Sequence, residues 1–191
     1  GRGLARGGLS DEALAQMVVA TLAGMSIEVL DQREFLAPWL LPAGTLGARA
    51  PVTAEWDEIR EGFRLAGRLA ADGVGQTVVR ARGVTVAVEA AEGTDEAIRR
   101  GTRLAGPGAV VVKAVVPEHD YRFDVPAIGP ATLEAMAAGR ARVLAPQGEA
   151  YVQVPVLQGL AGRLRRAVRT PLLRLARRPE HGAAFRGFRL T

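Results

Sequence analysis

Residues 109–115 spell Ala-Val-Val-Val-Lys-Ala-Val, a nearly unbroken apolar run in the middle of a 191-residue chain. Short runs rich in β-branched residues are typical of strands buried on both faces, as in sheets with helices on either side. Gly106-Pro107-Gly108 precedes the run and a charged loop follows it, so both of its ends are marked. The run therefore predicts the central strand of an α/β domain.

Helical and extended patterns alternate on both sides of this run. Apolar residues spaced by three or four, together with start signals at Ser10, Thr53, Thr94 and Pro130, predict helices at residues 11–24, 54–71, 95–104 and 130–138. β-rich segments predict strands at residues 26–30, 76–81, 84–90, 141–145 and 150–154. The alternation favours a single α/β domain in which a mixed β-sheet is flanked by helices.

Beyond Leu157 the pattern changes to leucines spaced by three or four, with arginines between them. Residues 160–191 contain nine Arg and one Glu, whereas the rest of the chain is mildly acidic, so the net charge of +5 comes from this tail. Pro171 interrupts the run, which predicts two short amphipathic helices. We therefore divide the chain into a domain at residues 1–155 and a basic amphipathic helical extension at residues 156–191.

Composition excludes several kinds of chemistry. The chain has no Cys and only two His, His119 and His181, so disulfides, thiolate nucleophiles and histidine-cluster metal sites are not expected. Carboxylates would have to hold any metal, which favours a hard ion such as Mg²⁺. The sequence has neither an apolar run of membrane-spanning length nor a secretory signal, so we expect a cytoplasmic protein. Because it begins at Gly1, we interpret the chain as a fragment or a processed product.

The loop after the apolar run is the most unusual part of the sequence. It holds Asp120, Arg122 and Asp124 within five residues, and Lys113 ends the strand that leads into it. Ligands of α/β sheets bind at the carboxyl ends of strands. Two convergent aspartates could hold a divalent cation or position a water, while Arg122 and Lys113 could neutralise phosphate oxygens. The alternative is a solvated loop with Asp–Arg ion pairs.

A second candidate is the segment Glu89-Ala-Ala-Glu92-Gly93-Thr94-Asp95. A strand delivers its glutamates, Gly93 permits a tight approach, and Thr94 with the following amides would face an anion at the start of a helix. An ordinary strand–turn–helix with a capping threonine is the alternative interpretation.

Taken together and in order, these segments resemble the C-terminal domain of LpxI-type UDP-2,3-diacylglucosamine pyrophosphatases over residues 8–145. The resemblance rests on the run from Val86 to Asp95, on Val110 to Lys113, and on the spaced pattern from Asp120 to Gly129. Three further stretches fit the family: Gly47-Ala-Arg-Ala-Pro51, Val74-Gly-Gln76 and the helix start at Ser10.

The resemblance implies a hydrolase that acts on a phosphoric anhydride. Enzymes of this family split UDP-2,3-diacylglucosamine into UMP and 2,3-diacylglucosamine 1-phosphate during lipid A biosynthesis, and they depend on Mg²⁺ and on an essential aspartate. By motif match Asp124 takes that role with Asp120 second, and both are expected to hold the metal. Arg122 and Lys113 are expected to stabilise charge on the pyrophosphate. The expected substrate contacts are Glu92, Gly93, Thr94, Asp95 and Gly129.

The chain departs from the family pattern in its domain content, in its loop and at its C-terminal end. The resemblance implies two domains with substrate between them, and the 191 residues are expected to cover only the C-terminal one. In the loop, Val116 and His119 replace a Lys and a Gln, and the match ends after about residue 146. The expected substrate partner is a nucleotide-linked acylated sugar, and the expected protein partner is a second copy of the chain in a homo-oligomer or a separate N-terminal half.

Two other functions stay open. The chain could bind a sugar phosphate or an acylated sugar without hydrolysing it, which requires the basic residues but no working carboxylates. Its tail could instead bind anionic lipid at the inner face of the membrane, which would suit a substrate with two acyl chains. A helix packed on the domain with a solvated arginine face is the structural alternative. Nucleic acid is not an expected partner, because few aromatic residues accompany the arginines.

Overall fold

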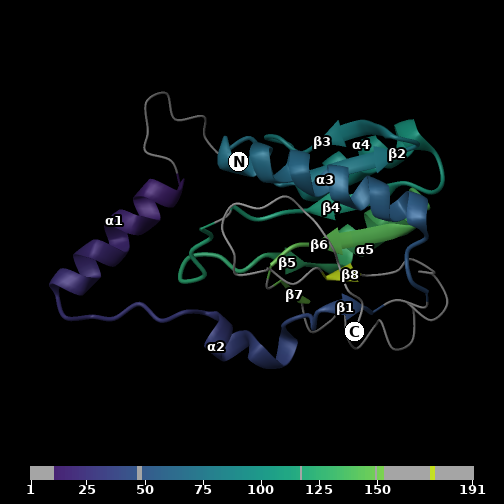
Figure 1. Ribbon diagram of the computed structural model, residues 1–191. Helices are drawn as coiled ribbons and strands as arrows, with labels where there is room; N and C mark the ends of the chain where they lie inside the picture. The colour runs from purple at the N-terminus through teal and green to yellow at the C-terminus, as the bar shows by residue number, and fades with distance from the viewer. Residues whose placement is uncertain (1–10, 47–48, 117, 149, 153–172, 175–191) are drawn as a thin grey trace.

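The fold was obtained as a computed structural model that describes residues 11–46, 49–116, 118–148, 150–152 and 173–174 (Figure 1). Its centre is a four-stranded sheet in the order β3-β2-β4-β6. The strands are β2 (Thr77–Ala81), β3 (Val84–Val88), β4 (Val110–Lys113) and β6 (Val143–Pro146). The helices that cover it are α3 (Thr53–Ala71), α4 (Thr94–Ala105) and α5 (Pro130–Ala138).

Strand β4 is the central strand that the apolar run predicts. It pairs antiparallel with β2 and parallel with β6, so the sheet is mixed. Val110, Val111 and Val112 are at most 1% exposed, because helices cover both faces of the sheet. The mixed α/β domain expected from the sequence is thereby confirmed.

Two separate apolar cores lie on the two faces of the sheet. On one face α3 contributes Ile59, Phe63 and Ala66, which pack with Val78, Val112 and Val143. On the other face α4 and α5 contribute Ile98 and Met136, which pack with Val79, Val111 and Leu144. Alternate residues of each strand thus point to opposite cores, as the two-residue period of a strand requires.

Glycines set how closely two helices approach the sheet. A Cβ atom at Gly62 of α3 would lie 2.5 Å from a methyl carbon of Val112, and one at Gly101 of α4 would lie 2.6 Å from Cβ of Val79. Neither glycine has a positive φ angle, so the requirement is for space and not for backbone freedom. Both helices therefore rest with their backbone directly on valines of the sheet.

The first part of the chain lies largely outside this core. Helix α1 (Asp11–Gly24) has the predicted bounds and stands away from the sheet at the left of Figure 1. The strand predicted at residues 26–30 is wrong: these residues form no strand, and Ile27 and Leu30 are about half exposed. A short apolar segment has no stable extended form without a partner strand, and none of the described strands pairs with it. Helix α2 (Arg33–Leu36) and the 3₁₀ turn η1 (Ala37–Trp39) follow.

Two small sheets complete the described structure. β1 (Gly44–Thr45) pairs with β8 (Leu173–Arg174), and β5 (Ala127–Ile128) pairs with β7 (Tyr151–Val152). Residues 173–174 are therefore extended and not helical. The rest of the predicted helical extension lies outside the described residues, and the division at residue 155 stays a prediction. In the described part of the chain, no helix is both long and apolar enough to cross a membrane.

Candidate functional site

Lys113 and Thr94, two of the candidate site residues, lie together at one end of the central sheet. Parallel strands β4 and β6 both end there, at Lys113 and Pro146, and the antiparallel strand β2 begins there with Thr77 opposite Lys113. Helix α4 begins close by, because Thr94 contacts Thr77 and Lys113. Thr132 in the first turn of α5 donates to Asp95 of α4. The sheet topology thus places the ends of several elements around Lys113, as is typical of ligand sites in α/β domains.

The Thr94 hydroxyl lies at the centre of a hydrogen-bond network at this end of the sheet. The hydroxyl donates to Glu89 Oε1 at 2.9 Å and lies 3.5 Å from both Lys113 Nζ and Thr77 Oγ1. Thr94 was expected to cap α4, but Gly93 occupies the N-cap position with φ 84°, and the hydroxyl of Thr94 turns back to the glutamate. The network fixes the Thr94 hydroxyl next to the lysine.

Glu89 is a site residue whose role the sequence did not reveal. It is 8% exposed, and its second carboxylate oxygen accepts from the backbone N–H of Gln76 at 3.4 Å. Burial of a charged carboxylate is tolerated when hydrogen bonds satisfy it. Its position shortly before the Glu92–Asp95 segment was the feature of the sequence that could have indicated a role in the site. Only the fold shows that its side chain faces inward.

Lys113 is the basic side chain at this end of the sheet, and its hydrogen-bond contacts are long. Its ammonium has three N–H groups, and its two contacts, with Thr94 Oγ1 and with the carbonyl oxygen of Ala127, are both 3.5 Å long. Within the described residues it forms no ion pair. A half-buried cation with long contacts to neutral oxygens retains capacity for an anion.

The start of helices α4 and α5 is joined by a short hydrogen bond. Thr132 Oγ1 donates to Asp95 Oδ1 at 2.6 Å, and Gly129 is the N-cap residue of α5. Glu92, in contrast, is turned toward α4, where Arg100 Nη2 donates to it at 2.5 Å. This hydrogen bond lowers the pKa of Glu92. Of the expected substrate contacts, Thr94 and Asp95 lie in the networks at the sheet end, whereas Glu92 is held by an arginine.

The loop after β4 contains a tight Asp–Arg pair. Arg122 donates from Nη2 to Asp120 Oδ2 at 2.7 Å and from Nε to Oδ1 at 3.0 Å, and its backbone N–H donates to the same Oδ1. The hydrogen bonds from Arg122 lower the pKa of Asp120, against the opposing effects of burial and of the negative charge of Asp31. The ion pair that was the alternative interpretation of this loop is therefore present.

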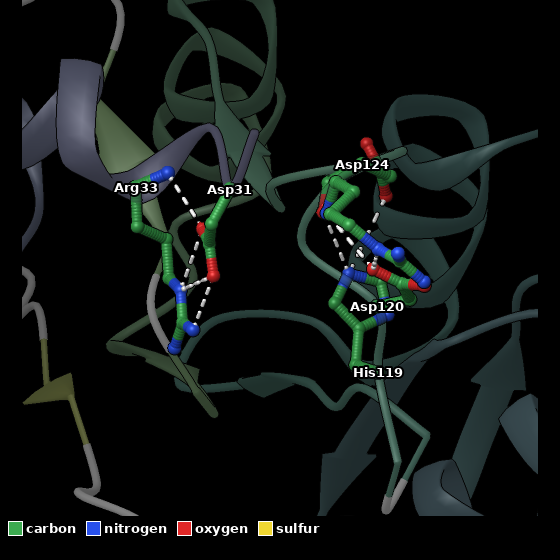
Figure 2. Close-up of polar contacts among 6 residues, drawn as sticks. Asp31, Arg33, His119, Asp120 and Asp124 are labelled. Carbon is green, nitrogen blue, oxygen red and sulfur yellow. Dashed lines mark hydrogen bonds and ion pairs between the residues drawn. The ribbon is translucent and has the colours of Figure 1, made fainter. Parts of the chain in front are cut away.

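Asp124 is the exposed carboxylate of the loop. Its side chain is 64% exposed, and one oxygen lies 4.0 Å from His119 Nε2. The same imidazole nitrogen is 2.9 Å from the backbone carbonyl oxygen of Asp124. Figure 2 shows the Asp124 carboxylate at the edge of this group of side chains. Its carboxylate thus has a contact with an imidazole but no guanidinium partner among the described residues.

The carboxylates of the loop suit a Mg²⁺ ion that takes its other ligands from phosphate and water. No group of three or more His, Cys, Asp and Glu side chains comes together in the described part of the chain. Mg²⁺ often needs only one or two carboxylates, because substrate phosphates and waters supply its other ligands. The exposed oxygens of Asp124 meet that requirement, while those of Asp120 are engaged by Arg122. The loop therefore fits an ion that is shared with a phosphate, and not a preformed protein cage.

Fold and site together define an α/β domain with basic, hydroxyl and carboxylate groups at one end of a mixed sheet. The family model of the LpxI C-terminal domain matches residues 42–155 of this chain. The chain is also 31% identical over 153 residues to a protein of Caulobacter vibrioides named UDP-2,3-diacylglucosamine pyrophosphatase LpxI. That match covers 74% of this chain and 54% of the relative, so the chain spans about half of the relative's length. The chain belongs to the LpxI family, as the resemblance in its sequence indicates.

Proposed function

We propose that this chain provides the C-terminal part of an enzyme that hydrolyses the pyrophosphate bond of UDP-2,3-diacylglucosamine, giving UMP and 2,3-diacylglucosamine 1-phosphate. The name of the Caulobacter relative, UDP-2,3-diacylglucosamine pyrophosphatase LpxI, supports this substrate. The observation that carries the proposal is the Lys113 ammonium, which lies at the sheet end beside Thr94 and has no carboxylate partner in the part of the chain that the structure describes.

The proposed roles follow from the charge and exposure of each side chain. Lys113 neutralises a phosphate oxygen of the pyrophosphate, because its N–H groups are poorly occupied. Thr94 and the first amides of α4 face the same phosphate from the helix start. Asp124 orients the attacking water, or accepts its proton, with an exposed carboxylate. Arg122 adds positive charge at the loop, although it shares that charge with Asp120.

Mg²⁺ is part of the proposal. When bound, it would supply charge stabilisation to the pyrophosphate oxygens, which is a common requirement of phosphoryl transfer. Asp124 and Asp120 are the residues that would hold it, and among the described residues Asp120 is paired with an arginine whereas Asp124 is not.

The direct test measures UMP release from UDP-2,3-diacylglucosamine with Mg²⁺. The 191-residue chain would be assayed alone and after fusion to the part of the Caulobacter relative that it does not cover. We expect Asp124→Ala to lower turnover by about 10²–10³, the usual scale for one positioned catalytic contact. Asp57→Ala is the matched control, because Asp57 is an exposed aspartate on α3. Turnover of the Asp124 variant within a few-fold of the parent would contradict the assignment.

A second candidate function is binding of a sugar phosphate or an acylated sugar without hydrolysis. The Asp120–Arg122 and Glu92–Arg100 pairs favour it, since they engage two of the expected acidic residues. Calorimetry separates the two functions. Micromolar binding of the substrate by the fused parent chain, with no UMP release under the same conditions, would support the binding module.

A further inference from the structure

A segment early in the chain lies against the Asp120–Asp124 loop. The backbone N–H of Gln32 donates to the carbonyl oxygen of Tyr121 at 3.2 Å, and its side-chain Nε2 donates to the carbonyl oxygen of Arg122 at 3.1 Å. One residue thus satisfies two successive carbonyl groups that are about ninety positions away in sequence. Polar backbone groups of a loop need such partners when they are withdrawn from water.

Arg33 holds the same loop through the ring of Tyr121. Its guanidinium carbon lies 4.1 Å from the ring centroid, and Tyr121 is 8% exposed. Asp31 fixes the arginine in turn: Arg33 Nε lies 2.9 Å from each oxygen of its carboxylate, and Nη2 lies 2.5 Å from Oδ2 (Figure 2). A cation placed over a desolvated aromatic face is a favourable contact, and the ion pair with Asp31 keeps it in place.

The contacts continue from Tyr121 to the carboxylate proposed for catalysis. His119 packs against the edge of the Tyr121 ring, with ring centroids 4.8 Å apart and an interplanar angle of 83°. The Nε2 atom of His119 is in turn 2.9 Å from the carbonyl oxygen of Asp124. Displacement of the tyrosine would therefore move the imidazole that contacts Asp124.

We propose that Gln32 and Arg33 are positioning residues, which fix the Asp120–Asp124 loop through Tyr121 and His119 and thereby orient Asp124. We call residues 31–33 the loop clamp. They lie outside residues 42–155, which match the family domain, so the clamp is a property of how this chain folds back on that domain. Its effect on catalysis rests on the proposed function, whereas its effect on the loop does not.

The first readout needs no activity. Hydrogen exchange of the 191-residue chain would be followed at the amides of His119, Arg122 and Phe123, which are hydrogen-bonded within the loop, and at the β4 amides as an internal reference. We expect Gln32→Ala, which removes the side-chain hydrogen bond to Arg122 and keeps the backbone one to Tyr121, to accelerate loop exchange by up to about tenfold, the scale of one lost hydrogen bond, and to leave β4 unchanged. Gln16→Ala, at an exposed glutamine of α1, is the matched control.

Arginine variants test the ring contact. Arg33→Ala should accelerate exchange in the loop, and Arg33→Lys should restore most of the protection, because lysine keeps a cation over the ring. Arg68→Ala, at an exposed arginine of α3, should match the parent chain. If the loop amides of Gln32→Ala and Arg33→Ala exchange at the same rates as those of the control variants, the proposal that the loop clamp fixes this loop is wrong.

The second readout is kinetic and uses the fused enzyme. In the Gln32→Ala and Arg33→Ala variants, kcat for UMP release should fall about tenfold while KM changes less than about twofold. The reason is that these variants affect the orientation of Asp124 and not substrate binding. An unchanged kcat in Gln32→Ala would overturn the catalytic role of the clamp. A parent enzyme without any turnover would contradict the proposed function, and the exchange rates would still decide whether the clamp exists.

Discussion

The guanidinium of Arg122 is bound to the carboxylate of Asp120, two residues earlier in the same loop, through hydrogen bonds of 2.7 Å and 3.0 Å. The loop thus neutralises its own arginine. Lys113 lies at the end of β4 with contacts of 3.5 Å to neutral oxygens and no ion pair among the described residues. Of the two basic residues expected to meet phosphate, the lysine is the one with unused capacity.

Replacement of Lys113 should therefore be costly for catalysis. We expect Lys113→Met to lower kcat/KM for UMP release by about 10²-fold, because a positioned charge in a sheltered site is lost. Lys113→Arg should recover little of this, since a planar guanidinium does not replace a compact ammonium beside Thr94. Steady-state kinetics with thermal melting as a folding control checks both variants. Activity of Lys113→Met within threefold of the parent would exclude the lysine as the phosphate contact.

Asp120 and Asp124 should differ in their importance. Asp120→Asn keeps the oxygen that accepts from the backbone N–H of Arg122 but removes the charge that pairs with its side chain. We expect a loss of about tenfold in kcat for this variant, compared with about 10²–10³ for Asp124→Ala. Rates measured over a range of Mg²⁺ concentrations would show which carboxylate changes the metal requirement. Equal losses at the two positions would contradict the difference in roles.

Stability at acid pH should depend on Glu55. This residue is 7% exposed, and although burial opposes its ionisation, hydrogen bonds from Arg49 and from the N–H of Val52 lower its pKa below the ordinary value. A carboxyl with a depressed pKa stabilises the fold above its unfolded pKa, and this stabilisation is lost as pH falls through the folded pKa.

We therefore expect Glu55→Gln to lower the free energy of unfolding by about 1.5–3 kcal/mol at pH 7. The difference from the parent chain should shrink below about pH 4, where the glutamate is increasingly protonated. Urea unfolding at pH 7 and at pH 3 measures both values. An equal difference at the two pH values would show that the charge of Glu55 is not responsible.

The close contact between α4 and the sheet predicts opposite effects for two Gly→Ala changes. At Gly101 a Cβ atom would overlap the side chain of Val79, so we expect a destabilisation of about 1–2 kcal/mol, after a helix-propensity gain of up to about 1 kcal/mol is included. At Gly67 of α3 nothing lies within 4 Å, so the same change should stabilise by about 0.5–1 kcal/mol. Thermal or urea unfolding of the pair checks this. A stabilised Gly101→Ala protein would show that α4 does not touch the sheet at this point.

The elements with a strong pattern were predictable from the sequence. The valines of β4, the Arg82-Gly83 turn between β2 and β3, and the proline that opens α5 each carry a local signal, and the predicted ranges agree with the structure to within a few residues. The segment at residues 26–30 has the same short apolar character but forms no strand. Its composition alone does not distinguish a strand from an exposed connection, because a strand exists only with a partner.

By itself, the sequence determined the α/β class, the LpxI family and the segments in which chemistry was to be expected, since periodicity, turn residues and motif order are properties of neighbouring positions. Tertiary structure alone decided which of those side chains meet. It turned Glu92 to Arg100, placed the hydroxyl of Thr94 between Glu89 and Lys113, and laid Gln32 against the loop that carries Asp124. The contact of Thr94 with Lys113 and that of Gln32 with the loop join residues that are distant in the chain, and all of these contacts depend on strand pairing and on the packing of helices against the sheet, which no local pattern encodes.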